Sequence, residues 1–553
     1  MMKIGEITVI IMVIASVNAG ITNNRFLVEA ERKWFLRALA EEQEHIRREL
    51  LASAVDGDLP RLEAALKDSC PTWNFGQECL DINVTDNEGR TPLIIAAING
   101  HVEVVKALLK DKRTDVNAQD SVWGATALLA ASFYGHGDVV QSLLKDGRMD
   151  VNMRSSGEGW TALYAACFNG HLDVVKMLLI NPGMDVNRQD SDGWTPLRVA
   201  SDNGLDDVVQ VLLTESRIDV NMQDLHGRTP LMAASGNGYS QIVNILLKDG
   251  RSDVNMQDYS GKTALHEAAE SGHDGVIRRL QTSPKTDVNT QDSDGNTALH
   301  IASDFGHFEA VHALLEDPKI DLNKQDSNGW TSQFSASESG HIDVLQALLK
   351  DPRTDVNMQN SLGMTPLLDA SSKGLVEVVQ TLLNDPRTDV NVQNVLGVTA
   401  LYEASFSGHV HVVRTLLMDP RTDVNMQDLD GWTAINAASF NGLFELVQAR
   451  LEDQWADESW TFEESYIRHK EVIQLLLRCR KTDAETLRYD DFVASYLSYF
   501  HNFQGDAKFR RRSILEWAGQ RANSIGLSSD ALESRERLIK DLGETCPNHK
   551  STD

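Results

Sequence analysis

The sequence has few cysteines and few basic residues for its length, and each shortage excludes a class of function. Five cysteines in 553 residues form no C-x-x-C pair and no Cys/His cluster with the spacing of a zinc site. The 52 Lys and Arg residues are outnumbered by 81 Asp and Glu residues, which gives a net charge of −29. Because such a surface repels phosphate backbones, we expect no nucleic-acid partner.

Membrane-spanning runs and catalytic groupings are also lacking. The apolar run from Ile7 to Val17 is short for a transmembrane helix, which needs about 20 apolar residues. No glycine loop that could cradle a phosphate follows a strand, and no pairing of nucleophile and base stands out. We therefore expect a protein that is not an enzyme, with no cofactor, no metal and no stable membrane span.

What the sequence does contain is an internal repeat of fixed period. The segment DPRTDVNMQ at 351–359 returns unchanged at 419–427, two periods later. A fixed period of this size is typical of a stacked solenoid, an architecture that presents long binding surfaces and seldom carries its own chemistry. A threonine opens each of the eleven units: Thr91, Thr126, Thr161, Thr195, Thr229, Thr263, Thr297, Thr331, Thr365, Thr399 and Thr433.

One unit shows the expected local structure. At Thr195 a hydroxyl cap followed by Pro196 predicts a helix start, and Gly204 predicts its end. Apolar residues at helical spacing over 208–213 predict a second helix. The segment from Ile218 to Thr229 is rich in Asp, Asn and Gly, which indicates tight turns. Each unit is thus expected to be helix, turn, helix and an extended β-hairpin finger.

These residues resemble the ankyrin repeat, whose pattern is roughly DGxTPLHxAAxxGHxxVVxLLLxxGADVN. Residues Gly261–Ala269 read GKTALHEAA, Gly272 and His273 form the GH turn, and 287–289 read DVN. The resemblance covers Leu50 to about Asp453. It implies an all-α solenoid with β-hairpin fingers, built from about eleven repeats plus caps.

The chain departs from the ankyrin pattern at two places. A longer link such as PRT stands before DVN, which explains why the period exceeds that of the ankyrin pattern by one. The histidine of the TPLH motif, which in this family hydrogen-bonds within the finger network, remains only at His266 and His300. We expect its loss elsewhere to reduce local rigidity while leaving the fold intact.

The repeats define the domain organisation. Residues 50–453 are expected to form the solenoid, with a cap repeat at 50–89 and full repeats over 90–453. Residues 20–49 predict an N-terminal helix whose apolar face docks on the cap. Residues 454–553 predict a helical C-terminal extension with a degenerate half repeat.

The N-terminal segment 1–19 has the pattern of a secretory signal peptide. Lys3 precedes the apolar run, and a small-residue cleavage site ends at Ala19. Most ankyrin-repeat proteins work in the cytosol or nucleus, so the resemblance implies the opposite location. Whether the run from Ile7 to Val17 is cleaved or anchors the chain stays open.

Three residues near the first finger depend on that location. Cys70 and Cys79 can close as a small disulfide in an oxidising compartment, or remain two free thiols in a reducing one. Asn83 begins the sequon Asn83-Val84-Thr85, an N-glycosylation signal that matters only if the chain is secreted.

Aromatic residues indicate where a partner would bind. The residue before each opening threonine is expected at a finger tip, and it is tryptophan in four units: Trp160, Trp194, Trp330 and Trp432. The end of the first helix lines the same concave side in ankyrin proteins. Five aromatic residues are densest there, and we expect them to bind the partner: Phe133, Tyr134, Trp160, Phe168 and Trp194. The other interpretation is that each tryptophan packs on the next finger and stiffens the array.

The charge of the fingers indicates the nature of that partner. Acidic residues recur at one finger position, so we expect a basic protein partner, although turn capping and solubility also explain these carboxylates. The interpretation is a protein–protein interaction scaffold of the secretory pathway. One alternative is a cytosolic adaptor with an uncleaved N-terminus. A minor alternative is a secreted toxin similar to latrotoxins, although their long helical N-terminal region is lacking.

Overall fold

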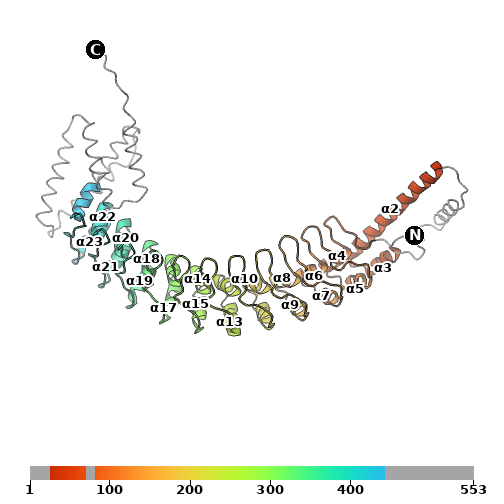
Figure 1. Ribbon diagram of the computed structural model, residues 1–553, viewed down its shortest axis with the longest axis horizontal. Helices are drawn as coiled ribbons and strands as arrows, with labels where there is room; N and C mark the ends of the chain where they lie inside the picture. The colour runs from red at the N-terminus through yellow and green to blue at the C-terminus, as the bar shows by residue number, and fades with distance from the viewer. Residues whose placement is uncertain (1–24, 70–80, 442–553) are drawn as a thin grey trace, which may run out of the picture. The chain divides into compact units, whose positions relative to one another are not determined.

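The computed structural model describes residues 25–69 and 81–441 of the chain (Figure 1). These residues fall into two units, Met1–Asp292 and Ser293–Asp553, and each is described by itself. The predicted signal peptide at 1–19, the Cys70–Cys79 pair and the C-terminal extension at 454–553 lie outside the described residues.

The first unit begins with α2 (Arg25–Asp56) and α3 (Leu59–Asp68), which pack on each other. Six helix pairs follow. The first helices of these pairs are α4 (Pro92–Ile98), α6 (Ala127–Phe133), α8 (Ala162–Phe168), α10 (Pro196–Asp202), α12 (Pro230–Gly236) and α14 (Ala264–Glu270). The second helices are α5 (Val102–Lys110), α7 (Gly137–Leu144), α9 (Leu172–Leu179), α11 (Asp206–Leu213), α13 (Ser240–Asp249) and α15 (Asp274–Gln281).

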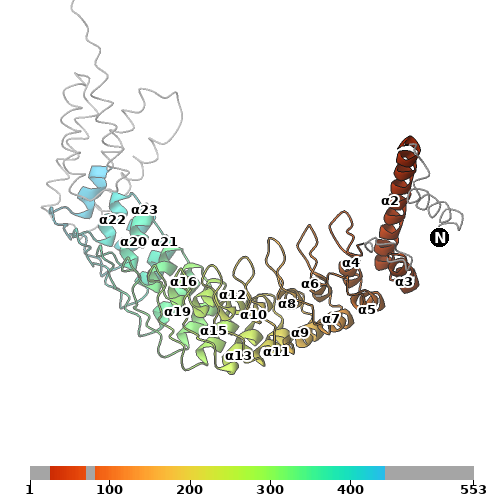
Figure 2. The same cartoon turned by 45° about the vertical axis from the view of Figure 1, so that its right-hand side comes forward.

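The second unit repeats the same pair four times before its described part ends with helical residues 434–441. Its first helices are α16 (Ala298–Asp304), α18 (Ser332–Glu338), α20 (Pro366–Lys373) and α22 (Ala400–Phe406). Its second helices are α17 (Phe308–Leu315), α19 (Ile342–Lys350), α21 (Val376–Leu383) and α23 (Val410–Met418). In each unit the first helices lie side by side between the finger loops and the second helices (Figures 1 and 2).

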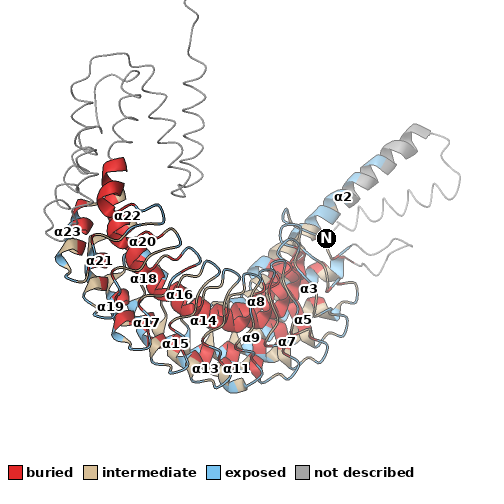
Figure 3. Ribbon diagram, turned by 60° about the vertical axis from the view of Figure 1, so that its left-hand side comes forward, coloured by how far each residue is buried: buried red, intermediate tan, exposed pale blue. Residues whose placement is uncertain are grey.

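Each first helix starts where the threonine caps it. Thr195, for example, has an extended backbone, and its hydroxyl oxygen accepts a hydrogen bond from the backbone N–H of Arg198 at 3.1 Å. Most first helices are only seven residues long, too short to be stable alone. Their stability comes from packing: six residues of α6 in sequence, Ala127 to Ser132, are buried. Other first helices, such as α8 and α16, are coloured as buried in Figure 3.

The turn between the paired helices holds adjacent repeats together. Gly135 has a φ of +77°, and a Cβ atom added there would lie 2.6 Å from Nδ1 of His171 in the next repeat. His171 in turn hydrogen-bonds through Nε2 to the carbonyl oxygen of Phe133 at 2.9 Å. The same bond to the preceding repeat is made by His101, His136, His273, His341 and His409. The recurring histidines therefore serve as inter-repeat connectors.

The β-hairpin fingers expected from the sequence are not observed: residues 25–69 and 81–441 contain no β-strand. The Asp190 side chain explains the difference, because its Oδ1 accepts hydrogen bonds from the backbone N–H groups of Asp192 (3.0 Å) and Trp194 (2.7 Å). This side chain closes a tight turn, so that no ladder of paired strands is needed. Side chains also tie neighbouring fingers: Gln189 Nε2 donates to the carbonyl oxygens of Gly193 and, in the next finger, Gln223.

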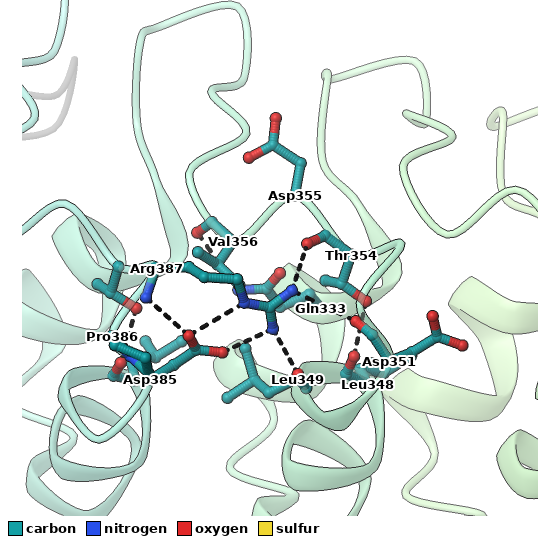
Figure 4. Close-up of polar contacts among 12 residues, drawn as sticks. Gln333, Leu348, Leu349, Asp351, Thr354, Asp355, Val356, Asp385, Pro386 and Arg387 are labelled. Atoms are coloured by element: carbon teal, nitrogen blue, oxygen red, sulfur yellow. Dashed lines mark hydrogen bonds and ion pairs between the residues drawn. The ribbon is translucent and has the colours of Figure 1, made fainter.

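The longer link between the second helix and DVN has a structural role of its own. Arg387 in this link forms an ion pair with Asp385 at 2.7 Å (Figure 4). Its guanidinium also donates to the carbonyl oxygens of Leu349 (2.5 Å) and Thr354 (3.1 Å) in the preceding repeat. Leu349 lies in the last turn of α19, where carbonyl groups have no partner within the helix. Equivalent arginines make such bonds elsewhere: Arg148, Arg217 and Arg251 in the first unit, and Arg353 and Arg421 in the second.

The asparagine of DVN forms a second link between repeats. Asn357 donates from Nδ2 to the carbonyl oxygen of Arg387 (2.9 Å) and accepts through Oδ1 from the backbone N–H of Asp389 (2.8 Å). We call this pair of hydrogen bonds the Asn clamp. It recurs at Asn83, Asn117, Asn152, Asn187, Asn221 and Asn255 in the first unit, and at Asn323 and Asn391 in the second.

Candidate functional site

Four of the five predicted binding residues form one aromatic cluster at the ends of α6 and α8. The Trp160 ring stacks on Phe133 (centroids 6.2 Å apart, planes at 24°) and lies 4.9 Å from Phe168. Phe133 contacts Tyr134 edge to face at 5.2 Å. Such ring pairs contribute stabilising free energy in addition to that gained by burying their apolar area. We call Phe133, Tyr134, Trp160 and Phe168 the aromatic cluster.

The members of the cluster differ in exposure, and this separates their roles. Phe133 and Trp160 are half-buried and pack on a buried core of Ala125, Leu129 and Ala165. Tyr134 and Phe168 leave 53% and 38% of their surface exposed. Trp160 therefore supports the cluster, while Tyr134 and Phe168 are the side chains available to a partner.

The fifth predicted residue, Trp194, lies in a different environment. The guanidinium of Arg198 sits over its ring, 4.3 Å from the centroid. Arg198 is 2% exposed and is paired with Asp202 (2.8 Å) and, in the next finger, Asp224 (3.6 Å). No ring contact joins Trp194 to the cluster among the pairs found in the described residues.

The expectation that the residue before each threonine lies at the finger tip is wrong. The backbone N–H of Trp194 bonds to Asp190, which places the tryptophan at the base of the turn. Trp432 at the same position is only 7% exposed. The tips are formed by the one to three residues after the Asp or Asn. Large exposed apolar side chains at the tips are Val122, Trp123, Leu225 and Tyr259 in the first unit, and Leu362, Val395 and Leu429 in the second.

At two of the tryptophans, packing of the indole ring on the side chain at the former histidine position stands in place of the TPLH hydrogen bond. Trp160 lies 5.2 Å from Tyr164, and Trp330 stacks on Phe334 at 3.3 Å. Tyr402, which also stands at the histidine position, reaches the next finger: its hydroxyl group donates a hydrogen bond to the Asp428 carboxylate at 3.0 Å. Burial and the Asp428 carboxylate raise the pKa of Tyr402, which keeps the hydroxyl protonated as a donor. In these repeats, new contacts occupy the place of the histidine hydrogen bond.

Two carboxyl groups with raised pKa values lie on the first helices of the second unit, the buried Asp369 and the half-buried Glu403. Burial raises the pKa of Glu403 on α22 to about 7, and the nearby Asp369 on α20 adds to the shift. Burial also raises the pKa of Asp369, opposed by Lys373, whose ammonium lies 3.0 Å from Asp369 and 2.6 Å from Glu338. Sequence reasoning missed Glu403, although the signal was present: an acidic residue stands at this first-helix position in three repeats, at Glu267, Asp369 and Glu403.

Asn83, the predicted glycosylation residue, is held by structural contacts, and the structure also buries Cys167. Asn83 lies in the first Asn clamp, between Asp81, Arg113 and Asp115. Cys167 is fully buried, and burial raises the pKa of its thiol. In the described part of the chain no three His, Cys, Asp or Glu side chains gather in a way that could hold a metal ion. The described helices also include none with the length and apolar character needed to cross a membrane.

Comparison with known families agrees with this architecture. The family of ankyrin repeats (three copies per match) fits the chain at residues 50–155, 148–224, 216–292, 278–360, 334–428 and 367–454. Together these matches span 50–454, the larger part of the chain. No curated protein matches the sequence. With its capped helix pairs, GH turns and DVN links, the chain belongs to the ankyrin repeat family.

Proposed function

We propose that the chain is a non-enzymatic scaffold that binds a partner protein through the aromatic cluster. The observation that carries this proposal is the exposure of Tyr134 and Phe168 on a rigid base of stacked rings. Aromatic side chains that are already fixed lose little conformational entropy on binding and dominate many interfaces. The family supports the same function, because ankyrin repeats are protein-interaction modules.

The proposed partner carries a basic surface. The chain has a net charge of −29, and carboxylates recur along its fingers. A basic partner would be attracted over a long distance and would then contact the apolar rings at short range. This division predicts an association rate that falls steeply with ionic strength and a dissociation rate that depends on Tyr134 and Phe168.

The proposed location is the secretory pathway. The apolar run from Ile7 to Val17 with its small-residue site at Ala19 supports this location. Mass spectrometry of the tagged protein from cells and medium tests it. A mature start at Gly20 with a Cys70–Cys79 disulfide supports secretion, whereas an intact start with free thiols supports the cytosolic adaptor.

A site-specific crosslinking experiment tests the binding surface. The photoreactive residue p-benzoylphenylalanine is placed at Tyr134, at Phe168 or, as a control, at Ile180, which is 81% exposed after the second helix α9. We expect one protein to crosslink at Tyr134 and Phe168 but not at Ile180. Crosslinking of that protein equally from all three positions would contradict a localised site.

Affinity measurements with the identified protein complete the test. The double variant Y134A/F168A should weaken binding at least tenfold, with little change in thermal stability. The I180A control should bind like the wild type. Unchanged affinity of the double variant would exclude the aromatic cluster as the binding surface.

A further inference from the structure

Asn83 combines two features that no other asparagine of the chain shares. It is the only asparagine in an N-x-S/T sequon, and it forms the first Asn clamp. This clamp joins the finger that follows α2 and α3 to the DVN link of the first full repeat. The residue is half-buried, whereas Thr85 of the same sequon is exposed.

The side-chain amide of Asn83 is fully engaged in the folded chain. Its Nδ2 donates to Oδ1 of Asp81 (3.0 Å) and to the carbonyl oxygen of Arg113 (3.0 Å). Its Oδ1 accepts from the backbone N–H of Asp115 at 2.7 Å. Both hydrogens of the amide are therefore used, and a carbon atom bonded to Nδ2 along either N–H direction would overlap an acceptor oxygen.

We propose that Asn83 is an N-glycan acceptor and that the glycan and the first Asn clamp exclude each other. A chain modified in the secretory lumen then holds its N-terminal cap, α2 and α3, less tightly than an unmodified chain. This inference rests on the proposed secretory location for its occurrence in the cell. The exclusion itself follows from the hydrogen bonds of the amide.

The transfer chemistry shows what the clamp loses. Nδ2 forms a bond to the anomeric carbon of a lipid-linked oligosaccharide, and the bond from that carbon to the pyrophosphate oxygen breaks. The lipid pyrophosphate leaves, and one amide proton passes to a base of the transferase. The modified nitrogen retains a single hydrogen, so it cannot serve both Asp81 and Arg113.

During synthesis, Asn83 is accessible to the transferase before its partners in the Asn clamp have been made. Arg113 and Asp115 follow Asn83 by 30 and 32 residues. At a synthesis rate of roughly 5–20 residues per second, these partners appear about 2–6 s after the asparagine. A transferase that acts on the emerging chain therefore meets Asn83 before the clamp can form.

Other contacts keep the modified cap attached. His101 still bonds to the carbonyl oxygen of Val55 at 2.9 Å, and Arg113 donates to the hydroxyl of Ser69 at 3.1 Å. The helices α2 and α4, and α3 and α5, also pack on each other. The expected effect is local loosening of the junction rather than unfolding of the array.

The test uses the full chain translated with microsomes, with either its own N-terminal segment 1–19 or an established cleavable signal in its place. Four variants are compared: wild type, Thr85→Ala (no sequon, clamp intact), Thr85→Ser (sequon kept) and Asn83→Gln (no sequon and an altered clamp). Glycosidase-sensitive mass reports the glycan, and amide hydrogen exchange over 81–90 and 113–117 reports the clamp.

The proposal expects a glycan on the wild type and on Thr85→Ser, with exchange in these segments roughly five- to tenfold faster than in Thr85→Ala. Asn83→Gln should exchange fast without a glycan. A translocated chain that carries no glycan at Asn83, or a glycosylated chain that exchanges like Thr85→Ala, would overturn the proposal. If the chain with its own N-terminus stays outside the microsomes while the chain with the established signal enters, the proposed secretory location is wrong. The chain with the established signal then still tests whether the glycan and the Asn clamp exclude each other.

Discussion

The guanidinium of Arg421 donates a hydrogen bond to the carbonyl oxygen of Leu383, the last residue of α21, across 2.7 Å. The arginine belongs to the following repeat, and Asp419 fixes its orientation through an ion pair at 2.7 Å. It also bonds to the carbonyl oxygen of Thr388 at 3.1 Å. The link that lengthens the repeat thus places an arginine on the exposed carbonyl end of the preceding helix.

Replacement of Arg421 by alanine should destabilise the second unit by about 1–3 kcal/mol, because several carbonyl bonds and one ion pair are lost. Arg421→Lys should recover only part of this stability, since an ammonium group lacks the planar fork that meets Asp419 and the carbonyls together. Urea unfolding measures the change. Arg414→Ala, which removes an exposed arginine from α23, is the control and should be close to neutral.

Gly135→Ala should destabilise the first unit by roughly 1–3 kcal/mol, because a left-handed backbone and the His171 ring both oppose a Cβ atom there. Gly147→Ala is a matched control: no atom lies within 4 Å of its added Cβ, and its φ lies outside the left-handed region. Thermal unfolding compares the two. Equal stability of both variants would show that the turn rearranges without cost.

Tyr402→Phe should cost about 1 kcal/mol, because the hydroxyl that reaches Asp428 in the next finger is lost while the ring remains. Tyr259→Phe removes a hydroxyl from a side chain that is 75% exposed and should leave stability unchanged. The two variants are compared by chemical denaturation. A loss of equal size in both would mean that the link between Tyr402 and Asp428 contributes nothing specific.

Glu403 should make the stability of the second unit depend on pH. Its folded pKa of about 7 lies above the usual 4.5, so the folded chain holds a proton that the unfolded chain releases. The stabilisation is complete below about pH 4.5 and is lost as the pH rises towards 7. The free energy of unfolding should fall by about 3 kcal/mol over this range. The groups facing it are Asp369 and, through Asp369, Lys373 and Glu338.

Glu403→Gln should remove this dependence. The variant is expected to be more stable than the wild type at pH 8, with a difference that shrinks towards pH 5. Thermal unfolding of both proteins across this range measures it. The control variant Glu377→Gln changes an exposed residue of α21, and its stability should depend on pH in the same way as that of the wild type. A constant difference between Glu403→Gln and the wild type would contradict a carboxyl group that is protonated in the folded chain.

The helix pairs could be predicted from the sequence because their signals are local. The threonine cap, the glycine with positive φ and the apolar spacing of the second helix each act within one repeat. The role of the arginine could not be predicted in this way. Its partners are backbone carbonyls 33 to 38 residues away. Every residue has a backbone carbonyl, so the sequence gives no signal of which ones the arginine contacts.

The aromatic site was predicted in part for a similar reason. The concentration of rings at Phe133, Tyr134, Trp160 and Phe168 is visible in the sequence, and the structure brings these four together. The position of the tryptophans within the finger was assigned wrongly, because one aspartate side chain draws the following backbone into a compact turn. The sequence also does not show that Trp194 lies apart from the cluster. Its ring packs under the guanidinium of Arg198, and the fold is what pairs that buried charge with Asp202.

Within each unit the links between repeats have a fixed direction: arginines and histidines donate to the preceding repeat, and the Asn clamp joins each repeat to the following one. The asparagine of the clamp recurs in every interior repeat of the sequence, whereas the histidine is replaced by Leu205, Tyr239 and Leu375 in three of them. Deleting or duplicating one whole repeat leaves the Asn clamps matched, whereas an insertion that is not a whole repeat breaks the register at one junction. The length of the binding face is thus free to change during evolution in steps of one repeat, without redesign of the junctions.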